Sequence, residues 1–224
     1  MIGCKIVNTN SEGLTNQLEK VSRLLDEEKE LRELLRHKRL RRLLVSNLIV
    51  LKSVDSTQAY AANELESKFE GDVVISKVQT AGKGREGRSW VSQSGGLWMT
   101  VILLPPINEI LGMIPAIATK SIVETFRDFG IPSCTIKLPN DVYCNGRKIA
   151  GVLADAVIQG AKSIVYLGIG ININNDPSEI EAISETATSL SKETGRKENL
   201  ARFAASLVEN LDRGYDEAIR GNEV

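Results

Sequence analysis

The sequence of 224 residues contains a single histidine, and this scarcity excludes several kinds of site. His37 lies in a run of charged residues, where a solvent-exposed side chain is expected. An H-E-x-x-H zinc site needs two histidines, and a Ser-His-Asp or Cys-His catalytic arrangement would have to use this one. Any chemistry is therefore expected to rest on Lys, Arg, Asp, Asn and backbone amides.

Cysteine is also scarce. Cys4, Cys134 and Cys144 are odd in number, lie far apart and form no C-x-x-C pair. Neither a disulfide framework nor a cysteine zinc site is indicated. We expect reduced, mostly buried thiols.

Long apolar runs and an excess of one charge are both missing. No apolar run reaches the roughly 18 residues of a transmembrane helix, and the first residues lack the apolar stretch of a secretion signal. The 28 Lys and Arg residues nearly balance the 29 Asp and Glu residues, so no overall field attracts nucleic acid or a membrane. We expect a cytoplasmic protein without a membrane partner, in which a nucleic-acid contact would need a local patch.

The first part of the chain predicts helix. Neither glycine nor proline occurs between Gly13 and Gly71, and apolar residues recur at helical spacing from Leu14 onward. Residues 1–45 are therefore predicted to form an N-terminal amphipathic helical extension. We expect the basic run at 36–42 to pack against the main domain or a second subunit, with DNA binding as the less favoured alternative.

Residues 46–224 are predicted to form the main domain. Short apolar runs predict strands at 47–52, 72–79, 97–104, 133–138, 142–144, 148–158 and 163–173. Helices are predicted at 55–69, 108–129 and 198–219. This order indicates an α+β fold with a mostly antiparallel mixed sheet and helices packed on one side of it.

A glycine-rich loop is the most unusual local feature. Residues 82–87 match G-x-G-x-x-G, but no helix begins within the glycines, as a dinucleotide-binding turn requires. Kinase and Walker A patterns do not fit either. The loop carries Lys83, Arg85 and Arg88, and glycines let backbone amides approach an anion that such cations neutralise. A surface loop with solvated charges and an anion-binding loop fit these residues equally well.

Two further stretches favour the anion-binding alternative. Residues 137–141 place a cation, an amide and a carboxylate around a tight turn. Lys148 is followed by Gly151 within a predicted strand, and residues 168–172, Gly-Ile-Gly-Ile-Asn, repeat this device in the next strand. Glycine inside a strand often marks the close approach of a ligand. These residues together predict one shared pocket.

These motifs resemble those of the biotin protein ligases. Residues 56–58 resemble the family's S-T-N, residues 79–90 its Q-x-A-G-R-G-R-x-G-R-x-W, and residues 137–141 its K-W-P-N-D. Residues 148–153 resemble K-[LI]-[AC]-G-[IV]-L, and residues 168–172 resemble G-x-G-[IV]-N. The motifs follow the family's order and spacing over most of the chain.

The resemblance implies a fold related to class II aminoacyl-tRNA synthetases and a two-step reaction. Biotin and ATP, accompanied by Mg²⁺, would give biotinyl-5′-adenylate and pyrophosphate. A lysine of a biotin carboxyl carrier protein would then take the biotinyl group. The Mg²⁺ would be held through the ATP phosphates without a direct protein ligand, and a homodimer is implied by family analogy alone.

The resemblance also implies roles for individual residues. Arg85, Asp141 and Lys148 would be catalytic, with Asp141 orienting or helping to deprotonate the incoming amine, and residues 82–88 would close over the adenylate. The biotin site would consist of Ser56, Thr57, Gln58, Gln79, Gly82, Lys83, Gly84, Arg85, Lys148 and Gly151. The ATP site would consist of Arg85, Arg88, Trp90, Lys137, Asn140, Lys148 and Asn172.

The sequence also departs from the family pattern. Lys83 and Leu138 stand where the family usually has Arg and Trp, and we expect the family's small C-terminal SH3-like β-barrel domain to be absent. The N-terminal segment is too short and uninterrupted for the winged helix of the regulatory members. The alternatives are a lipoate or octanoyl ligase or transferase, a biotin-sensing DNA-binding regulator, and a catalytically idle interaction protein.

Overall fold

The computed structural model describes residues 26–106, 108–131, 133–160 and 162–221, which form one seven-stranded sheet with helices on both faces. The strands are β1 (Leu48–Leu51), β2 (Val73–Ser76), β3 (Leu97–Leu103), β4 (Cys134–Lys137), β5 (Asp141–Cys144), β6 (Arg147–Gln159) and β7 (Lys162–Ile171). The α-helices are a helix at 26–36, α2 (Thr57–Asn63), α3 (Ile114–Asp128), α4 (Leu190–Thr194) and α5 (Leu200–Gly221). Short 3₁₀ helices occur as η1 (Arg85–Gly87), η2 (Asn108–Met113) and η3 (Pro177–Glu179).

The sheet has the order β1-β2-β3-β7-β6-β5-β4, and only β1 and β2 pair in parallel. The predicted mostly antiparallel α+β fold is therefore confirmed. The turn between β5 and β6 is the one that Asn145-Gly146 predicts, and both residues adopt positive φ there. In the described part of the chain, no helix is both long and apolar enough to cross a bilayer.

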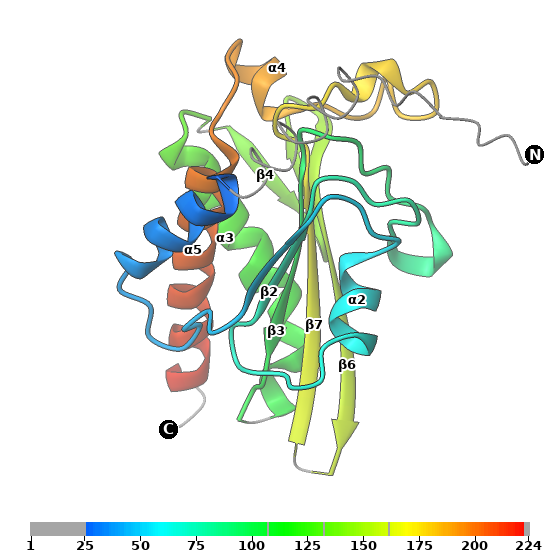
Figure 1. The fold of residues 1–224 in the computed structure, drawn as a ribbon. Coiled ribbons are helices and arrows are strands. Elements are labelled where there is room, and N and C mark those ends of the chain that lie inside the picture. Colours follow the sequence, from blue (N-terminus) through cyan, green and yellow to red (C-terminus); the bar gives the residue numbers. More distant parts are fainter. Residues whose placement is uncertain (1–25, 107, 132, 161, 222–224) are drawn as a thin grey trace, which may run out of the picture.

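The two faces of the sheet carry separate hydrophobic clusters. α3 and α5 cover one face (Figure 1), where Val73 of β2 joins the larger cluster. The neighbouring Val74 points to the opposite face and packs with Ala61 of α2, because side chains alternate along a strand. The prediction of helices on one side thus holds for the long helices and is wrong for α2.

The structure also shortens α2. Ser56 caps its N-terminus and accepts a hydrogen bond from the backbone of Ala59. The helix ends at Asn63 rather than near residue 69. The chain instead turns towards β2, and the Asp72 carboxylate accepts hydrogen bonds from the backbone amides of Phe69 and Asn47.

The predicted N-terminal helix is wrong beyond residue 36, and residues 1–25 lie outside the described part of the chain. The Asp212 carboxylate of α5 accepts hydrogen bonds from the backbone amides of Arg41, Arg42 and Leu43, at 2.7, 2.8 and 2.7 Å. Amides that donate to this carboxylate cannot continue a helical hydrogen-bond ladder. The basic run packs against the main domain, as expected, and Leu43 is buried in the larger core.

The cysteine prediction is wrong for two of the three residues. Cys134 and Cys144 are joined by a disulfide, while Cys4 lies outside the described residues. The two cysteines are direct partners across β4 and β5, with their Cα atoms 4.4 Å apart. That distance is typical of a non-hydrogen-bonded antiparallel pair, so the hairpin register brings the two thiols together.

A buried carboxylate at Asp216 completes the docking of the basic run on α5. Arg41 and Arg42 contact its two oxygens at 3.0 and 2.9 Å, and Arg220 lies at 3.1 Å. Burial alone would raise the pKa of Asp216, but the hydrogen bonds from Arg41 and Arg42 and the charge of Arg220 outweigh burial and lower this pKa. The carboxylate therefore contributes stability only while it is ionised.

We expect Asp216→Asn to reduce the free energy of unfolding by about 1–3 kcal/mol near neutral pH, because several hydrogen bonds to a charged group are lost. The wild-type advantage should be complete above the ordinary aspartate pKa and should disappear as the pH falls through the lowered folded-state pKa. Urea unfolding at a series of pH values measures this. Glu217→Gln, at an exposed position of the same helix, is the control, and an advantage that grows in acid would contradict the assignment.

Candidate functional site

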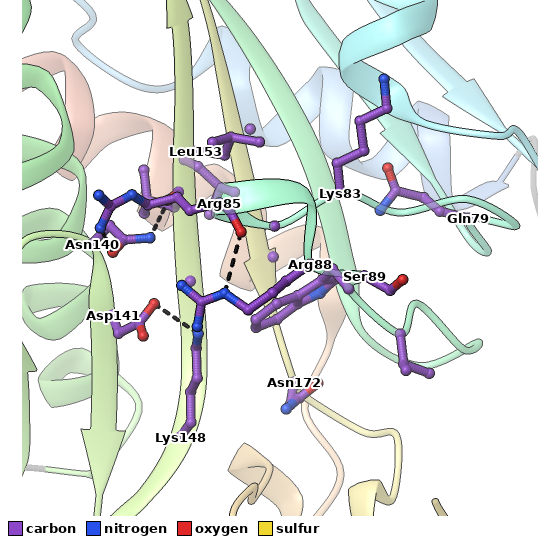
Figure 2. Close-up of a pocket in the computed structure, with 18 of the residues that line it drawn as sticks. Gln79, Lys83, Arg85, Arg88, Ser89, Asn140, Asp141, Lys148, Leu153 and Asn172 are labelled. Carbon is purple, nitrogen blue, oxygen red and sulfur yellow. Dashed lines mark hydrogen bonds and ion pairs between the residues drawn. The ribbon is translucent and has the colours of Figure 1, made fainter. Parts of the chain in front are cut away.

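A cavity of about 240 Å³ opens on the face of the sheet that carries α2 (Figure 2). Fourteen of the residues assigned to the site from the sequence line it: Ser56, Thr57, Gln58, Gln79, Lys83, Gly84, Arg85, Arg88, Trp90, Asn140, Asp141, Lys148, Gly151 and Asn172. They come from α2, the glycine-rich loop, the turn between β4 and β5, and strands β6 and β7. The structure thus brings together segments that are far apart in the sequence, although their individual roles stay predictions.

Two assigned residues do not line the cavity. Gly82 packs behind the loop, where an added Cβ would lie 2.4 Å from the backbone oxygen of Trp90. Lys137 is exposed, and its Nζ lies 5.1 Å from the ring centroid of Tyr143. Leu138, at the position where the family usually has Trp, is 75% exposed. The turn is present, but these side chains do not form the cavity wall.

The polar residues at the start of α2 are held by a hydrogen-bond network. The Gln79 side-chain oxygen accepts from both the backbone amide and the hydroxyl of Thr57, at 2.8 and 3.1 Å. The Gln79 amide donates to Ser92, and Thr100 of β3 donates to the Thr57 hydroxyl. The end of the cavity next to α2 is therefore held in place by hydrogen bonds within the protein.

Gln58 crosses the floor of the cavity. Its side-chain amide donates to the backbone oxygens of Tyr166 and Leu153, at 2.9 and 3.2 Å. An added Cβ at Gly168 would lie only 2.6 Å from the end of this side chain. Gly168 therefore makes room for Gln58 on the surface of β7.

Trp90 lies on a second glycine surface. Gly151 and Gly170 are direct partners across β6 and β7, and added Cβ atoms would lie 3.0 and 2.6 Å from the indole. Trp98 contacts the indole edge-on, with ring centroids 6.4 Å apart. The sequence indicated that a ligand comes close to these strands at their glycines. At Gly151 and Gly170 it is instead the side chain of Trp90 that does so. Its Nε1 is buried and has no hydrogen-bond partner among the described residues.

The charged side chains meet above Trp90. Lys148 Nζ lies 2.7 Å from Asp141 Oδ1 and 5.1 Å from the centroid of the Trp90 ring. Arg85 of the glycine-rich loop donates to Asn140 of the β4–β5 turn at 3.2 Å, so that loop and turn are joined (Figure 2). Four cations and one carboxylate line the cavity among the described residues. This excess of positive charge suits an anionic ligand.

Sequence reasoning missed one wall of the cavity. Ile183, Thr186 and Ala187 line it from the segment between β7 and α4. The backbone of Lys148 holds this segment: its amide donates to Thr186 and its carbonyl accepts from Thr188, at 2.8 and 2.9 Å. Because these contacts are hydrogen bonds between main-chain atoms, no side-chain pattern in the sequence could predict them.

A metal site made by protein side chains alone is not found in the described part of the chain. No group of three or more His, Cys, Asp or Glu side chains gathers there. Asp141 is the single carboxylate among the described cavity residues.

We expect Gly170→Ala to displace the Trp90 indole, because the new methyl group would overlap Nε1, and to destabilise the protein by about 1–3 kcal/mol through overpacking. Near-ultraviolet circular dichroism and acrylamide quenching of tryptophan fluorescence measure the displacement. Gly112→Ala, whose Cβ would meet no atom within 4 Å, is the control. Unchanged spectra for Gly170→Ala would show that the surface of Gly151 and Gly170 does not hold the indole.

Comparisons with known proteins agree on one family. The model of the biotin/lipoate A/B protein ligase family matches residues 50–172. The bifunctional ligase/repressor BirA of Bacillus subtilis (strain 168) is 33% identical over 170 residues, which are 74% of this chain and 52% of that protein. The biotin–[acetyl-CoA-carboxylase] ligase of Paracoccus denitrificans is 30% identical over 165 residues, 71% of this chain and 69% of that protein.

The fold is also similar to that of a solved relative. The biotin protein ligase from Aquifex aeolicus, in complex with biotin and ATP, superposes with a TM-score of 0.69 at 33% identity. The match covers 78% of this chain and 72% of that chain. The chain spans about half the length of the first curated relatives that it matches.

Proposed function

Because this chain belongs to the biotin/lipoate A/B protein ligase family, as a biotin protein ligase catalytic domain, we propose that it activates biotin with ATP and transfers the biotinyl group to a carrier lysine. The observation that carries this proposal is the cavity itself, which is lined by four cations and by a glycine surface. The solved relative from Aquifex aeolicus, with the same fold, binds both biotin and ATP.

The first step joins two anions and therefore needs fixed positive charge. An oxygen of the biotin carboxylate attacks the α-phosphorus of ATP, the bond from that phosphorus to the β-phosphate oxygen breaks, and pyrophosphate leaves. Arg85 and Lys148 are the cations that we place at the developing charge. A well-aimed donor of this kind contributes typically about 3 kcal/mol to transition-state stabilisation.

The second step transfers the acyl group. The carrier lysine nitrogen attacks the biotinyl carbonyl carbon, the bond to the phosphate oxygen breaks, AMP leaves, and the amine gives its proton to solvent with the help of Asp141. Asp141 is the carboxylate that we place near this amine. Its ion pair with Lys148, at 2.7 Å, fixes the carboxylate in the lining of the cavity.

The ends of the cavity suit the two substrates differently. We place biotin at Ser56 and at the network of Thr57 and Gln79, and the nucleotide near Trp90, whose indole offers a stacking surface for adenine. Arg88 extends the positive charge along the loop. Asn172 uses its side chain within the protein, donating to the Thr188 backbone and accepting from Asn175, so its contribution would be to hold the nucleotide wall.

Magnesium fits this arrangement as a companion of ATP. Mg²⁺ in such sites is usually bound by one or two carboxylates together with substrate phosphates. Among the described residues, the cavity offers one carboxylate beside four cations, and that carboxylate, Asp141, is paired with Lys148. The ion would therefore be held through the ATP phosphates without a direct protein ligand, and it would neutralise phosphate charge.

The proposal extends to the partners and the setting. The carrier is a biotin carboxyl carrier protein, and the expected location is the cytoplasm, where ATP is available. A homodimer also belongs to it, because β4 is an edge strand, and the apolar side chains of Ile136 in this strand and Leu138 just after it are exposed. DNA binding is not proposed, since Lys38, Arg41 and Arg42 are paired with carboxylates of α5.

The direct test is streptavidin detection of biotin transfer to a carrier domain, with and without ATP. We expect transfer that depends on ATP, and a loss of about 100–1,000-fold in the rate of adenylate formation for Lys148→Met. Lys162→Met, at an exposed position at the far end of β7, is the control. Transfer of lipoate or octanoate in place of biotin would overturn the assignment of substrate.

The contact between Arg85 and Asn140 predicts how the intermediate is retained. Arg85→Gly removes the contact that joins the loop to the turn, so we expect biotinyl-5′-adenylate to escape into solution faster by about tenfold or more. Release of labelled adenylate from the enzyme, followed by rapid filtration, measures this. Arg85→Lys keeps the charge and should lose only part of the retention. Equal retention in wild type and Arg85→Gly would exclude the closure role.

A further inference from the structure

The short helix α4 contacts both ends of the cavity wall that contains Ile183, Thr186 and Ala187. The wall segment, residues 176–188, begins after β7 and ends just before α4. Lys192 contacts Asp176 and Ser178 at the start of the segment, at 2.8 and 2.6 Å. The adjacent Glu193 contacts Thr188 at its end, at 2.5 Å.

The contacts of Lys192 and those of Glu193 differ in burial. The Lys192–Asp176 pair is partly exposed, although hydrogen bonds from Lys192 and Ser178 lower the pKa of Asp176 to about 2. Exposed pairs contribute little to stability. The side chain of Glu193 is only 6% exposed, so a change in its contacts has a larger effect.

The Glu193 carboxylate joins three parts of the chain. One oxygen accepts from the Thr188 hydroxyl at 2.5 Å and from Arg147 at 3.3 Å. The other accepts from the side-chain amide of Asn145 at 2.5 Å. Glu193 therefore connects α4 to the β5–β6 turn and to the end of the wall segment.

Both connections lead directly to Lys148. Arg147 precedes Lys148 in the chain, and the Thr188 amide donates to the Lys148 carbonyl at 2.9 Å. The Thr188 carbonyl also accepts from Asn172 at 3.0 Å. The backbone around Lys148 is thus fixed on one side by Arg147 and on the other by Thr188, and one carboxylate holds both.

We propose that Glu193 is a positioning residue, which fixes Lys148 and the wall segment for nucleotide binding without contacting a substrate. This role rests on the proposed ligase function. It accounts for a buried carboxylate that lies outside the cavity yet binds the two stretches that frame Lys148. The biotin end of the cavity, at Thr57 and Gln79, has its own network and does not depend on Glu193.

The test is Glu193→Gln in the full chain, which keeps the size of the side chain but removes its charge and places a donor among donors. We expect the KM for ATP to rise about tenfold, as for the loss of a hydrogen bond to a charged group. The KM for biotin should rise less, because the biotin site shares Lys148 but is otherwise held by the separate contacts of Thr57 and Gln79. Glu185→Gln, an exposed carboxylate on the wall segment, is the control and should change neither KM value.

A second variant tests the route through Thr188. Thr188→Val should raise the KM for ATP in the same way, and the double variant with Glu193→Gln should lose less than the product of the two single effects. An equal rise in both KM values together with a loss of thermal stability would show a merely structural role and would overturn the proposal. An unchanged KM for ATP in Glu193→Gln would do the same.

Amide hydrogen exchange separates this proposal from the ligase assignment. In Glu193→Gln, exchange should accelerate in peptides covering residues 145–148 and 183–189 but not in β3. If wild type proves inactive with biotin and ATP, the proposed function fails, and the exchange result alone decides the positioning role. Unchanged exchange in both peptides would then overturn it.

Discussion

The site depends on the absence of side chains on one face of the sheet. Gly151, Gly168 and Gly170 leave the backbone of β6 and β7 bare, and Trp90 and Gln58 lie so close to it that an added methyl group would displace or crowd them. Trp90 anchors the end of the glycine-rich loop, while Gln58 anchors α2. The position of the glycine-rich loop relative to α2 therefore depends on the absence of side chains at these glycines of β6 and β7.

Charge is then arranged around this packed platform. Lys148 lies above the Trp90 ring and pairs with Asp141, so an aromatic face and a carboxylate hold one ammonium group from two sides. Arg85 approaches from the loop and meets Asn140. An anionic substrate would enter a region whose cations are already held in place, which reduces the reorganisation needed during the reaction.

Much of this could be predicted from the sequence because the informative signals are local. The Asn145-Gly146 turn, the Ser56 cap and the glycine pairs follow from backbone chemistry within a few residues. The helix predicted through residue 45 was wrong because Asp212, distant in sequence, competes for its backbone amides. The disulfide depends on the hairpin register, which cysteine spacing alone does not reveal.

The grip of Asp212 on Arg41, Arg42 and Leu43 also bears on how the chain folds. These contacts join residues separated by 169 to 171 positions, so the loop that they close is among the longest that the chain can form. The entropic cost of closing such a loop is offset only after the intervening sheet has assembled. We expect these hydrogen bonds to Asp212 to form late, on a nearly complete sheet, and to break first when the protein begins to unfold.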